Sequence, residues 1–296
     1  MRPLLFLLFT LLQAGAEAGN LTEKLPELDA FLSDVRANLR SDRLLQSQYT
    51  YNLKQTRTHL DKEGKPENIE ADEFEVFPSL DEKYTYERQT VKDGEPLDPE
   101  EIEKQDRSHE KKLKKRAKEL EKEGLNERTR RLRKEDEERR KEDLIVDELF
   151  RMYEFSLMRR ELIDQTRAIL LEFRPRPGFK PSSREVKFLS HLAGRAWFCE
   201  EDHQLIRAEV EFIDNVSFGK GLLARLHKGT KASILRRRVN GEIWLPAAAT
   251  IEGSARILLF KKIRIRTVNE YSDYKKFVVD TAIDYRTGGQ DGESTP

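Results

Sequence analysis

A series of segments with every-second-residue alternation, between residues 194 and 280, constrains the fold more than any other feature. In Leu205–Phe212, apolar side chains stand at Ile206, Ala208, Val210 and Phe212, and Leu205 and charged residues stand between them. Successive side chains of a strand point to opposite faces, so this pattern predicts a strand with one buried face. Gly194–Glu200 precedes it, and the acidic turn Glu201–Gln204 joins the two into a predicted antiparallel hairpin.

The same region predicts further antiparallel strands. Leu222–His227 and Ala232–Val239 read as strands, and Asn240-Gly241 supplies the two positive-φ residues of a tight type I′ hairpin turn. Glu242–Leu245 returns along the sheet, and we expect Pro246 to end that strand because proline donates no ladder hydrogen bond. The last long strands are expected at Ile251–Val268 and Lys276–Asp280.

The N-terminal residues predict export from the cytoplasm. Arg2 precedes an apolar run, Leu4–Leu12, and small residues follow it up to Ala18. This is the pattern of a secretory signal peptide over residues 1–18, cleaved after Ala18. The run is shorter than the ~20 apolar residues that span a bilayer. The alternative is a buried N-terminal strand or helix. We expect a periplasmic mature protein that does not span the membrane and, with no cysteine after the cleavage region, carries no lipid anchor.

Between the leader and residue 194, helical and strand patterns alternate. Leu25–Leu45 has apolar residues spaced three and four apart, which predicts an amphipathic helix. Lys180–Leu192 is interpreted as a linker or short helix. Strands are expected at Gln48–Asp61, Ile69–Phe77, Glu82–Val91, Glu154–Ile163 and Thr166–Arg174.

One segment breaks this pattern. Asp98–Asp143 consists almost entirely of Glu, Lys and Arg, and its few leucines keep no heptad phase, so a long coiled-coil seam is not favoured. Glu and Lys three or four residues apart stabilise a solvated helix, and Gly124 is expected to divide the segment into two helices. It is interpreted either as a solvated charged run or as an arm that docks a partner protein; Leu144–Tyr153 then returns it to the core.

Reactive-group patterns are not found in the sequence. Positive and negative charges balance, which gives no global field to attract nucleic acid. The single cysteine, Cys199, excludes an intrachain disulfide and is interpreted as a small buried residue. The five histidines are scattered, and there is no His-Glu-x-x-His or nucleophile-elbow motif. We therefore expect no catalysis, no metal, no cofactor and no nucleic-acid partner.

Four segments carry a family resemblance. Gly194–Phe198, Gly219–Leu223, Val239–Pro246 and Tyr271–Phe277 resemble the outer-membrane lipoprotein-sorting (LolA-like) superfamily of periplasmic proteins, and within it the large uncharacterised branch. The resemblance covers roughly residues 25–96 and 144–286. It implies a mainly β fold with helices (α+β), a curved, incomplete antiparallel barrel covered by helices, to which this chain adds the charged helical insertion. Better-known members carry the acyl chains of lipoproteins or bind lipoproteins and lipid-like molecules as sensors.

The resemblance leads to a division of the chain and a functional hypothesis. The segments are a signal peptide (1–18), the N-terminal helix and first strands (19–97), the charged insertion (98–143), the remaining strands (144–286) and a disordered tail (287–296). The hypothesis is a non-catalytic carrier or chaperone for lipid or lipoprotein acyl chains, held in an apolar cavity between sheet and helices. The alternative is a cell-envelope interaction or sensing module that uses the charged arm. The candidate cavity residues are Leu28, Leu32, Val35, Leu149, Phe150, Leu171, Phe173, Trp197 and Trp244.

Overall fold

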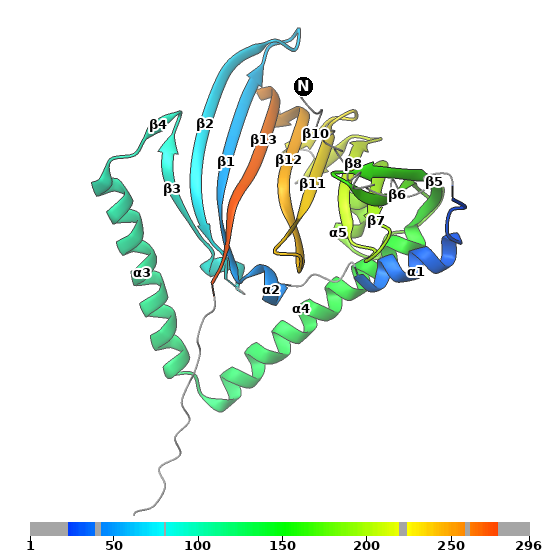
Figure 1. The fold of residues 1–296 in the computed structure, drawn as a ribbon. Helices are drawn as coiled ribbons and strands as arrows, with labels where there is room; N and C mark the ends of the chain where they lie inside the picture. Colours follow the sequence, from blue (N-terminus) through cyan, green and yellow to red (C-terminus); the bar gives the residue numbers. More distant parts are fainter. Residues whose placement is uncertain (1–22, 39–42, 80, 219–223, 258–260, 278–296) are drawn as a thin grey trace, which may run out of the picture.

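The computed structural model describes residues 23–38, 43–79, 81–218, 224–257 and 261–277. The predicted signal peptide and the predicted disordered tail lie outside these residues. Across the described residues, a single curved antiparallel sheet carries the helices (Figure 1). Its strands run in the order β4-β3-β2-β1-β13-β12-β11-β8-β7-β6-β5, with β4 and β5 as free edges, so the sheet is not closed. This confirms the predicted fold class.

The described strands divide between the two halves of the chain. The N-terminal half supplies β1 (Tyr49–Leu60), β2 (Pro66–Phe77), β3 (Tyr86–Lys92) and β4 (Glu95–Pro96). The C-terminal half supplies β5 (Tyr153–Ile163), β6 (Thr166–Pro175), β7 (Leu192–Cys199), β8 (Leu205–Phe212), β9 (Val216–Phe218), β10 (Ala224–Leu226), β11 (Lys231–Val239), β12 (Ile243–Ile257) and β13 (Lys261–Lys276). The halves join where β1 pairs with β13, from Tyr49 opposite Lys276 to His59 opposite Ile265.

Two long helices connect the free edges of the sheet. α3 (Pro99–Glu121) follows edge strand β4, and α4 (Leu125–Met152) leads into edge strand β5. The Asp98 side chain caps α3 by accepting from the Glu100 N–H at 2.8 Å, and Pro99 stands at the first helical position. α4 begins after Gly124, which confirms the predicted break between the two helices. In Figure 1 the pair forms a V whose apex projects away from the sheet.

The shorter helices lie near the strand ends. They are α1 (Leu28–Asn38), α2 (Arg43–Gln46) and α5 (Arg184–Leu189), with a 3-10 turn η1 (Glu82–Tyr84). The predicted helix Leu25–Leu45 was wrong at its start, because residues 24–27 are not helical and the helix begins at Leu28; residues 39–42 lie outside the described residues. The predicted strand Glu82–Val91 was also wrong at its start, since η1 occupies that position and β3 begins at Tyr86.

The Asn240-Gly241 hairpin is confirmed, with φ of 51° and 71° at its two residues. Pro246, however, does not end its strand. The register slips between Leu235 and Arg236, so that Arg236 faces Pro246 while Leu235 faces Ala248. This bulge accommodates the proline, and β12 pairs with β13 only from Ala248 onward, so that side of the proline needs no ladder bond.

The predicted continuous strand Ile251–Val268 was wrong as well. β12 ends at Ile257, which stands opposite Lys261 of β13, so the chain reverses within that segment. β13 then continues to Lys276, where a separate last strand was expected; residues 278–280 of that expected strand lie outside the described residues. The other predicted hairpins agree with β1–β2, β5–β6 and β7–β8 within a few residues.

Candidate functional site

One row of paired residues shows that a single face of the C-terminal sheet is apolar. Register pairs link Leu157 of β5 through successive strands to Ala249 of β12. The row reads Leu157, Leu171, Ala196, Ala208, Ile234 and Ala249. Because paired residues of neighbouring strands share a face, these six side chains form one continuous apolar strip.

The adjacent row, on the opposite face, is polar. It reads Ser156, Glu172, Arg195, Glu209, Ser233 and Thr250 along the same strands. The carboxylate of Glu172 accepts from Arg195 at 3.0 Å, a cross-strand pair typical of a solvated face. Along these two neighbouring rows, therefore, one face of the sheet is apolar and the other is polar, and a ligand without charge would be expected on the apolar face.

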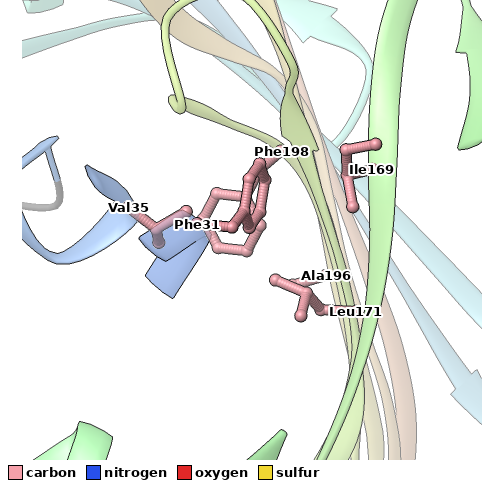
Figure 2. Packing of buried hydrophobic residues seen from close by; sticks show 6 residues of the cluster. All are labelled: Phe31, Val35, Ile169, Leu171, Ala196 and Phe198. Atoms are coloured by element: carbon pink, nitrogen blue, oxygen red, sulfur yellow. The ribbon is translucent and has the colours of Figure 1, made fainter. Parts of the chain in front are cut away.

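Helix α1 covers one end of the apolar strip. Figure 2 shows Phe31 and Val35 pointing toward Ile169, Leu171, Ala196 and Phe198 of β6 and β7. The Phe31 and Phe198 rings meet edge to face with centroids 6.4 Å apart. Burying each large apolar side chain contributes about 1.5–3 kcal/mol, so these few contacts are what holds a three-turn helix on the sheet.

The margin of this α1 cluster is only half-buried. Eight apolar side chains surround the buried centre: Leu25, Leu28, Leu32, Phe150, Phe155, Leu157, Phe173 and Leu205. They come from α1 and the residues just before it, from α4, and from the three strands β5, β6 and β8. A margin of this kind is adaptable, because partly exposed apolar side chains gain further burial when another apolar group is placed against them.

Polar contacts fix both ends of the α1 segment. Arg36 pairs with Asp147 of α4 at 2.6 Å. Before the helix, the Arg160 guanidinium donates to the Glu23 carbonyl oxygen at 2.8 Å and also to the Glu200 carboxylate. The Arg160 side chain is only 2% exposed. Hydrogen bonding to Arg160 lowers the pKa of Glu200, which stays ionised and keeps this anchor charged.

The middle of the apolar strip has a more open floor. Ala208, Ile234 and Ala249, on β8, β11 and β12, are half-buried, whereas Leu171 and Ala196 under α1 are buried. Two of these three side chains are alanine, so little side chain rises from the sheet here. The result is a shallow apolar floor that begins at α1 and runs toward β13.

A tyrosine pocket lies beyond that floor, on the same face. The Tyr51 ring is tilted against the rings of Tyr274 and Tyr271, with its centroid 5.3 Å from the first and 5.8 Å from the second. Tyr49 meets Tyr274 edge to face at 6.4 Å. The pocket has a volume of about 220 Å³. It is lined by Gln46, Ser47, Tyr49, Tyr51, Pro78, Ser79, Thr85, Leu245, Pro246 and Tyr274. Burial raises the pKa of Tyr51 to about 12, so this phenol stays neutral.

The N-terminal half of the same face is polar. The row of paired residues that contains Ala249 continues through Asn269, Gln55 and Asp72. Gln55 donates to the Asn269 side-chain oxygen at 3.1 Å, and buried Asp72 accepts from Arg57 and Gln89. These groups hydrogen-bond one another, with only the buried Nε of Arg57 left without a hydrogen-bond partner among the described residues, so this region of the face is a structural polar network. Together with the tyrosine pocket, it bounds the apolar floor on the side away from α1.

The structure places seven of the nine predicted cavity residues close together. Leu28, Leu32, Val35, Phe150, Leu171 and Phe173 belong to the α1 cluster. Leu149 belongs to a neighbouring cluster built on Met152, Tyr153 and Val186, and Phe173 packs against both clusters. Neither the tyrosine pocket nor a second groove of about 630 Å³ between β3 and α3 contains any of the nine.

Trp197 and Trp244 lie elsewhere. Trp197 alternates with Ala196 and Phe198 on β7, so it stands on the opposite face from the α1 cluster. Both indoles pack in one cluster with Cys199, and their N–H groups donate to Glu161 at 2.7 Å and Asp202 at 2.9 Å. Burial raises the pKa of the Cys199 thiol, as expected for a structural cysteine.

The tyrosine pocket was missed by reasoning from sequence. Tyr49 and Tyr51 alternate on β1 as predicted, but their partners Tyr271 and Tyr274 are more than 200 positions away and reach them through the β1–β13 pairing. The close spacing of Tyr271 and Tyr274 was the available indication. The positive φ of Asp273, 53°, marks the irregularity that brings Tyr274 onto the same face.

The described residues contain neither a candidate metal site nor a helix that could span a membrane. Among them, no group of three or more His, Cys, Asp or Glu side chains could hold a metal ion. Within the same ranges of the chain, every helix is either too short or too polar to cross a bilayer.

The comparisons with known proteins give fold-level matches. No family model and no curated protein match the chain. Among solved structures, a DUF1329 family protein from Desulfovibrio piger ATCC 29098 is 13% identical, covers 84% of this chain and 94% of its own, and has a TM-score of 0.27. An outer membrane lipoprotein-sorting protein domain from Vibrio parahaemolyticus is 11% identical, with coverages of 86% and 93% and a TM-score of 0.29.

A third match is MucB in its complex with MucA(peri), at 8% identity, coverages of 83% and 94% and a TM-score of 0.22. The matches include a lipoprotein-sorting protein domain, which is the kind of protein that the four sequence segments resemble. At these TM-scores the likeness says nothing about function, so the function of this chain has to be argued from its own residues.

Proposed function

We propose that this chain is an exported, non-catalytic carrier that holds acyl chains of a lipid or lipoprotein against the apolar side of its sheet. The observation that carries the proposal is the half-buried apolar floor of Ala208, Ile234 and Ala249, with the α1 cluster at one end and the tyrosine pocket at the other. An extended chain without charge fits such a floor, because it needs contact area and no hydrogen-bond partner.

The size of the pocket indicates how a chain would lie. At about 220 Å³ it is smaller than the ~300–1,000 Å³ of most ligand sites. It would take the end of an acyl chain, and the rest would lie along the floor toward α1. Each buried methylene contributes about 0.8 kcal/mol, so a dozen carbons suffice for binding without any charged contact.

The margin of the α1 cluster supplies the remaining cover. Leu28, Leu32 and Phe150, which were candidate residues from the sequence, are half-buried there and would close over a bound chain. Leu149, Leu171 and Phe173 would support them from below. Trp197 and Trp244 have no role in this proposal, because they pack on the other side of the sheet.

The first test is native mass spectrometry of the mature protein, purified without detergent from a periplasm, followed by lipid extraction. A co-purifying mass that extracts as an acyl lipid supports the proposal and gives the class of cargo. Reading the N-terminus of the same sample tests cleavage after Ala18. A clean apo mass, together with no uptake of a fluorescent fatty acid, would exclude a carrier.

Two neighbouring substitutions make the second test. Ala249→Asp places a charge on the apolar floor and should weaken fatty-acid uptake by about tenfold or more, because burying an unpaired carboxylate is costly. Thr250→Asp introduces the same side chain one residue later on the polar face and should leave uptake unchanged. Equal loss in both variants would mean that the floor is not the binding surface.

A further inference from the structure

The apex of the V formed by α3 and α4 combines three unusual properties. We define the apex as residues 111–134, which include the end of α3, Gly124 and the start of α4. It includes the part of the two helices that lies farthest from the sheet in Figure 1, and at its start Lys112 and Arg116 still lie over the Tyr84 ring of η1. None of the α3 residues is buried, and α4 is buried only at Glu148 and Met152, far from the apex. The apex is therefore available to a partner.

Charge is strongly segregated to this apex. Residues 111–134 contain twelve Lys and Arg and four Glu, an excess of eight positive charges. Because the whole chain has 55 basic and 55 acidic residues, the other residues carry an excess of eight negative charges. Most of that negative charge flanks the apex on the same helices, since residues 98–110 carry a net charge of −4 and residues 135–143 a net charge of −3. The pair of helices is therefore positive at its tip and negative nearer the sheet.

Much of this positive charge is not neutralised internally. Arg131 pairs with Glu123 at 2.8 Å and Lys114 pairs with Glu110 at 2.5 Å. Seven other basic side chains of the apex make no ion pair with any described residue: Lys111, Lys112, Lys118, Lys122, Arg128, Arg130 and Arg133. They are exposed and, apart from Lys112 over the Tyr84 ring, their charges are directed to solvent and to whatever approaches the apex.

Leucines are exposed among these charges. Leu125, the first residue of α4, is 83% exposed, and Leu113, Leu120 and Leu132 are 41–45% exposed. Leu125 and Leu132 are seven residues apart, so they share one side of α4, and Arg128 and Arg133 flank that side. Leu125 has the largest exposed fraction among the exposed large apolar side chains of the described residues. Single exposed leucines are common on protein surfaces, but several grouped at a projecting, positively charged tip supply the apolar part of a candidate interaction surface.

We propose that the apex binds the surface of an anionic phospholipid bilayer. Clustered Lys and Arg are attracted to anionic headgroups, and exposed leucines bury themselves at the boundary between headgroups and acyl chains. A nucleic acid would also attract the charges. However, residues 111–134 contain no aromatic side chain on which a base could stack, and a phosphate backbone would leave the four leucines without a contact.

The proposal is independent of acyl-chain binding, because no residue of the α1 cluster or the tyrosine pocket lies in the apex. It gives the two long helices a role that the carrier function does not require. A carrier that rests on a bilayer through its arm would hold its apolar floor near the source of its cargo.

The test is co-sedimentation of the purified mature protein with vesicles of phosphatidylglycerol mixed with phosphatidylcholine, and with vesicles of phosphatidylcholine alone. We expect binding to the mixed vesicles only, and a steep loss as salt shortens the screening length below ~10 Å. Absence of binding to the anionic vesicles at low salt would overturn the proposal. So would tighter binding to a DNA or RNA oligomer of equal charge, or to an acidic polypeptide, than to the vesicles.

A pair of charge variants locates the surface. Replacing Arg128, Arg130 and Arg133 together by Glu should weaken vesicle binding by about a hundredfold, since each basic residue near an anionic surface contributes roughly fivefold. The control replaces Arg139, Arg140 and Lys141 by Glu, which is the same charge change on exposed positions of the same helix nearer the sheet. If the control loses binding as strongly as the apex variant, the apex is not the contact surface.

Leu125→Trp reports insertion directly. The natural tryptophans Trp197 and Trp244 are buried, so an added indole at position 125 dominates any change on binding. Its emission should shift to shorter wavelength with anionic vesicles and stay unchanged with phosphatidylcholine vesicles. Binding of this variant without a spectral shift would mean that the leucines stay in water, and would contradict the proposed mode of binding.

Discussion

Helices α1 and α3 show two different ways to hold a helix in one chain. α1 has 11 residues and buries Phe31 and Val35, whereas α3 has 23 residues and buries none. Short helices are marginal in water, so α1 depends on the sheet beneath it. α3 has no buried side chain and is held instead by polar and ring contacts with β3: Gln105 exchanges two hydrogen bonds with Gln89, and His109 stacks on Tyr86 at 4.2 Å. Its exposed side adds a capped N-terminus and ion pairs between successive turns. Helix length therefore does not report how strongly a helix is tied to this fold.

The sharpest test of this difference removes one apolar side chain from each helix. Phe31→Ala should lower the free energy of unfolding by about 3–5 kcal/mol, because it leaves a cavity under α1. Leu120→Ala in α3 should change it by no more than about 0.5 kcal/mol, since that side chain is exposed. Urea unfolding followed by far-UV circular dichroism measures both. Similar losses would mean that α3 packs in a way that the difference in burial does not capture.

Glycines extend the comparison to the backbone. A Cβ at Gly194 of β7 would lie 2.0 Å from the Glu209 carbonyl oxygen, whereas one at Gly124 meets nothing within 4 Å. Gly194→Ala should cost about 1–3 kcal/mol of stability, since the neighbouring strand has to move. Gly124→Ala changes only the cap of α4 and should cost about 1 kcal/mol or less. Thermal melting of the two variants distinguishes them, and a neutral Gly194→Ala would contradict the close approach of β7 and β8.

The anchor before α1 should make stability depend on pH. Hydrogen bonding to Arg160 lowers the pKa of Glu200 below its usual 4.5. A carboxylate with a lowered pKa in the folded state stabilises the fold above its unfolded pKa and loses that contribution as pH falls through the folded value. We expect stability to decline below about pH 4.5, and Glu200→Gln to flatten this region of the profile. If the stability of Glu200→Gln declines below about pH 4.5 as steeply as that of the natural protein, other groups cause the pH dependence.

The smallest effect is expected on the arm. Glu103→Gln removes the ion pair with Arg107, and both side chains are more than half exposed. The change in unfolding free energy should be about 0.3–0.5 kcal/mol at low salt and should vanish as salt screens the pair. Urea unfolding at two salt concentrations measures it. A larger or salt-independent loss would show that Glu103 does more than pair with Arg107 on the next turn of α3.

The features that the sequence predicted well depend on neighbouring residues. The Asn240-Gly241 turn, the helix break at Gly124 and the β5–β6 hairpin each follow from a few adjacent side chains. The prediction that Pro246 ends its strand was wrong. The sheet accepts the proline because β11 and β12 form a bulge there and because β13 pairs with β12 only from Ala248 onward, and neither feature can be read from the residues next to Pro246. The reversal after Ile257 was missed since no Gly, Pro or Asn marks it.

Of the candidate site, the sequence predicted the residues on the helix side but not all of those on the sheet side. Leu28, Leu32 and Val35 were found because a three- and four-residue spacing places them on one side of α1. Trp197 was placed with them because a large aromatic residue was expected in any cavity, whereas its alternation with Ala196 puts it on the other face. The tyrosine pocket could not be predicted in this way, because it forms only when β1 and β13, more than 200 residues apart, lie side by side.

The pairing of β1 with β13 also has a consequence for the synthesis of the protein. β1 begins at Tyr49 and its partner strand ends at Lys276, so the centre of the sheet cannot form until almost all of the chain has been made. Contacts between such distant positions form late and slowly. The nascent chain therefore cannot complete the centre of its sheet during synthesis, and β1 has to wait without its β13 partner until the last strand has left the ribosome. The order of the strands thus delays folding until synthesis is nearly over.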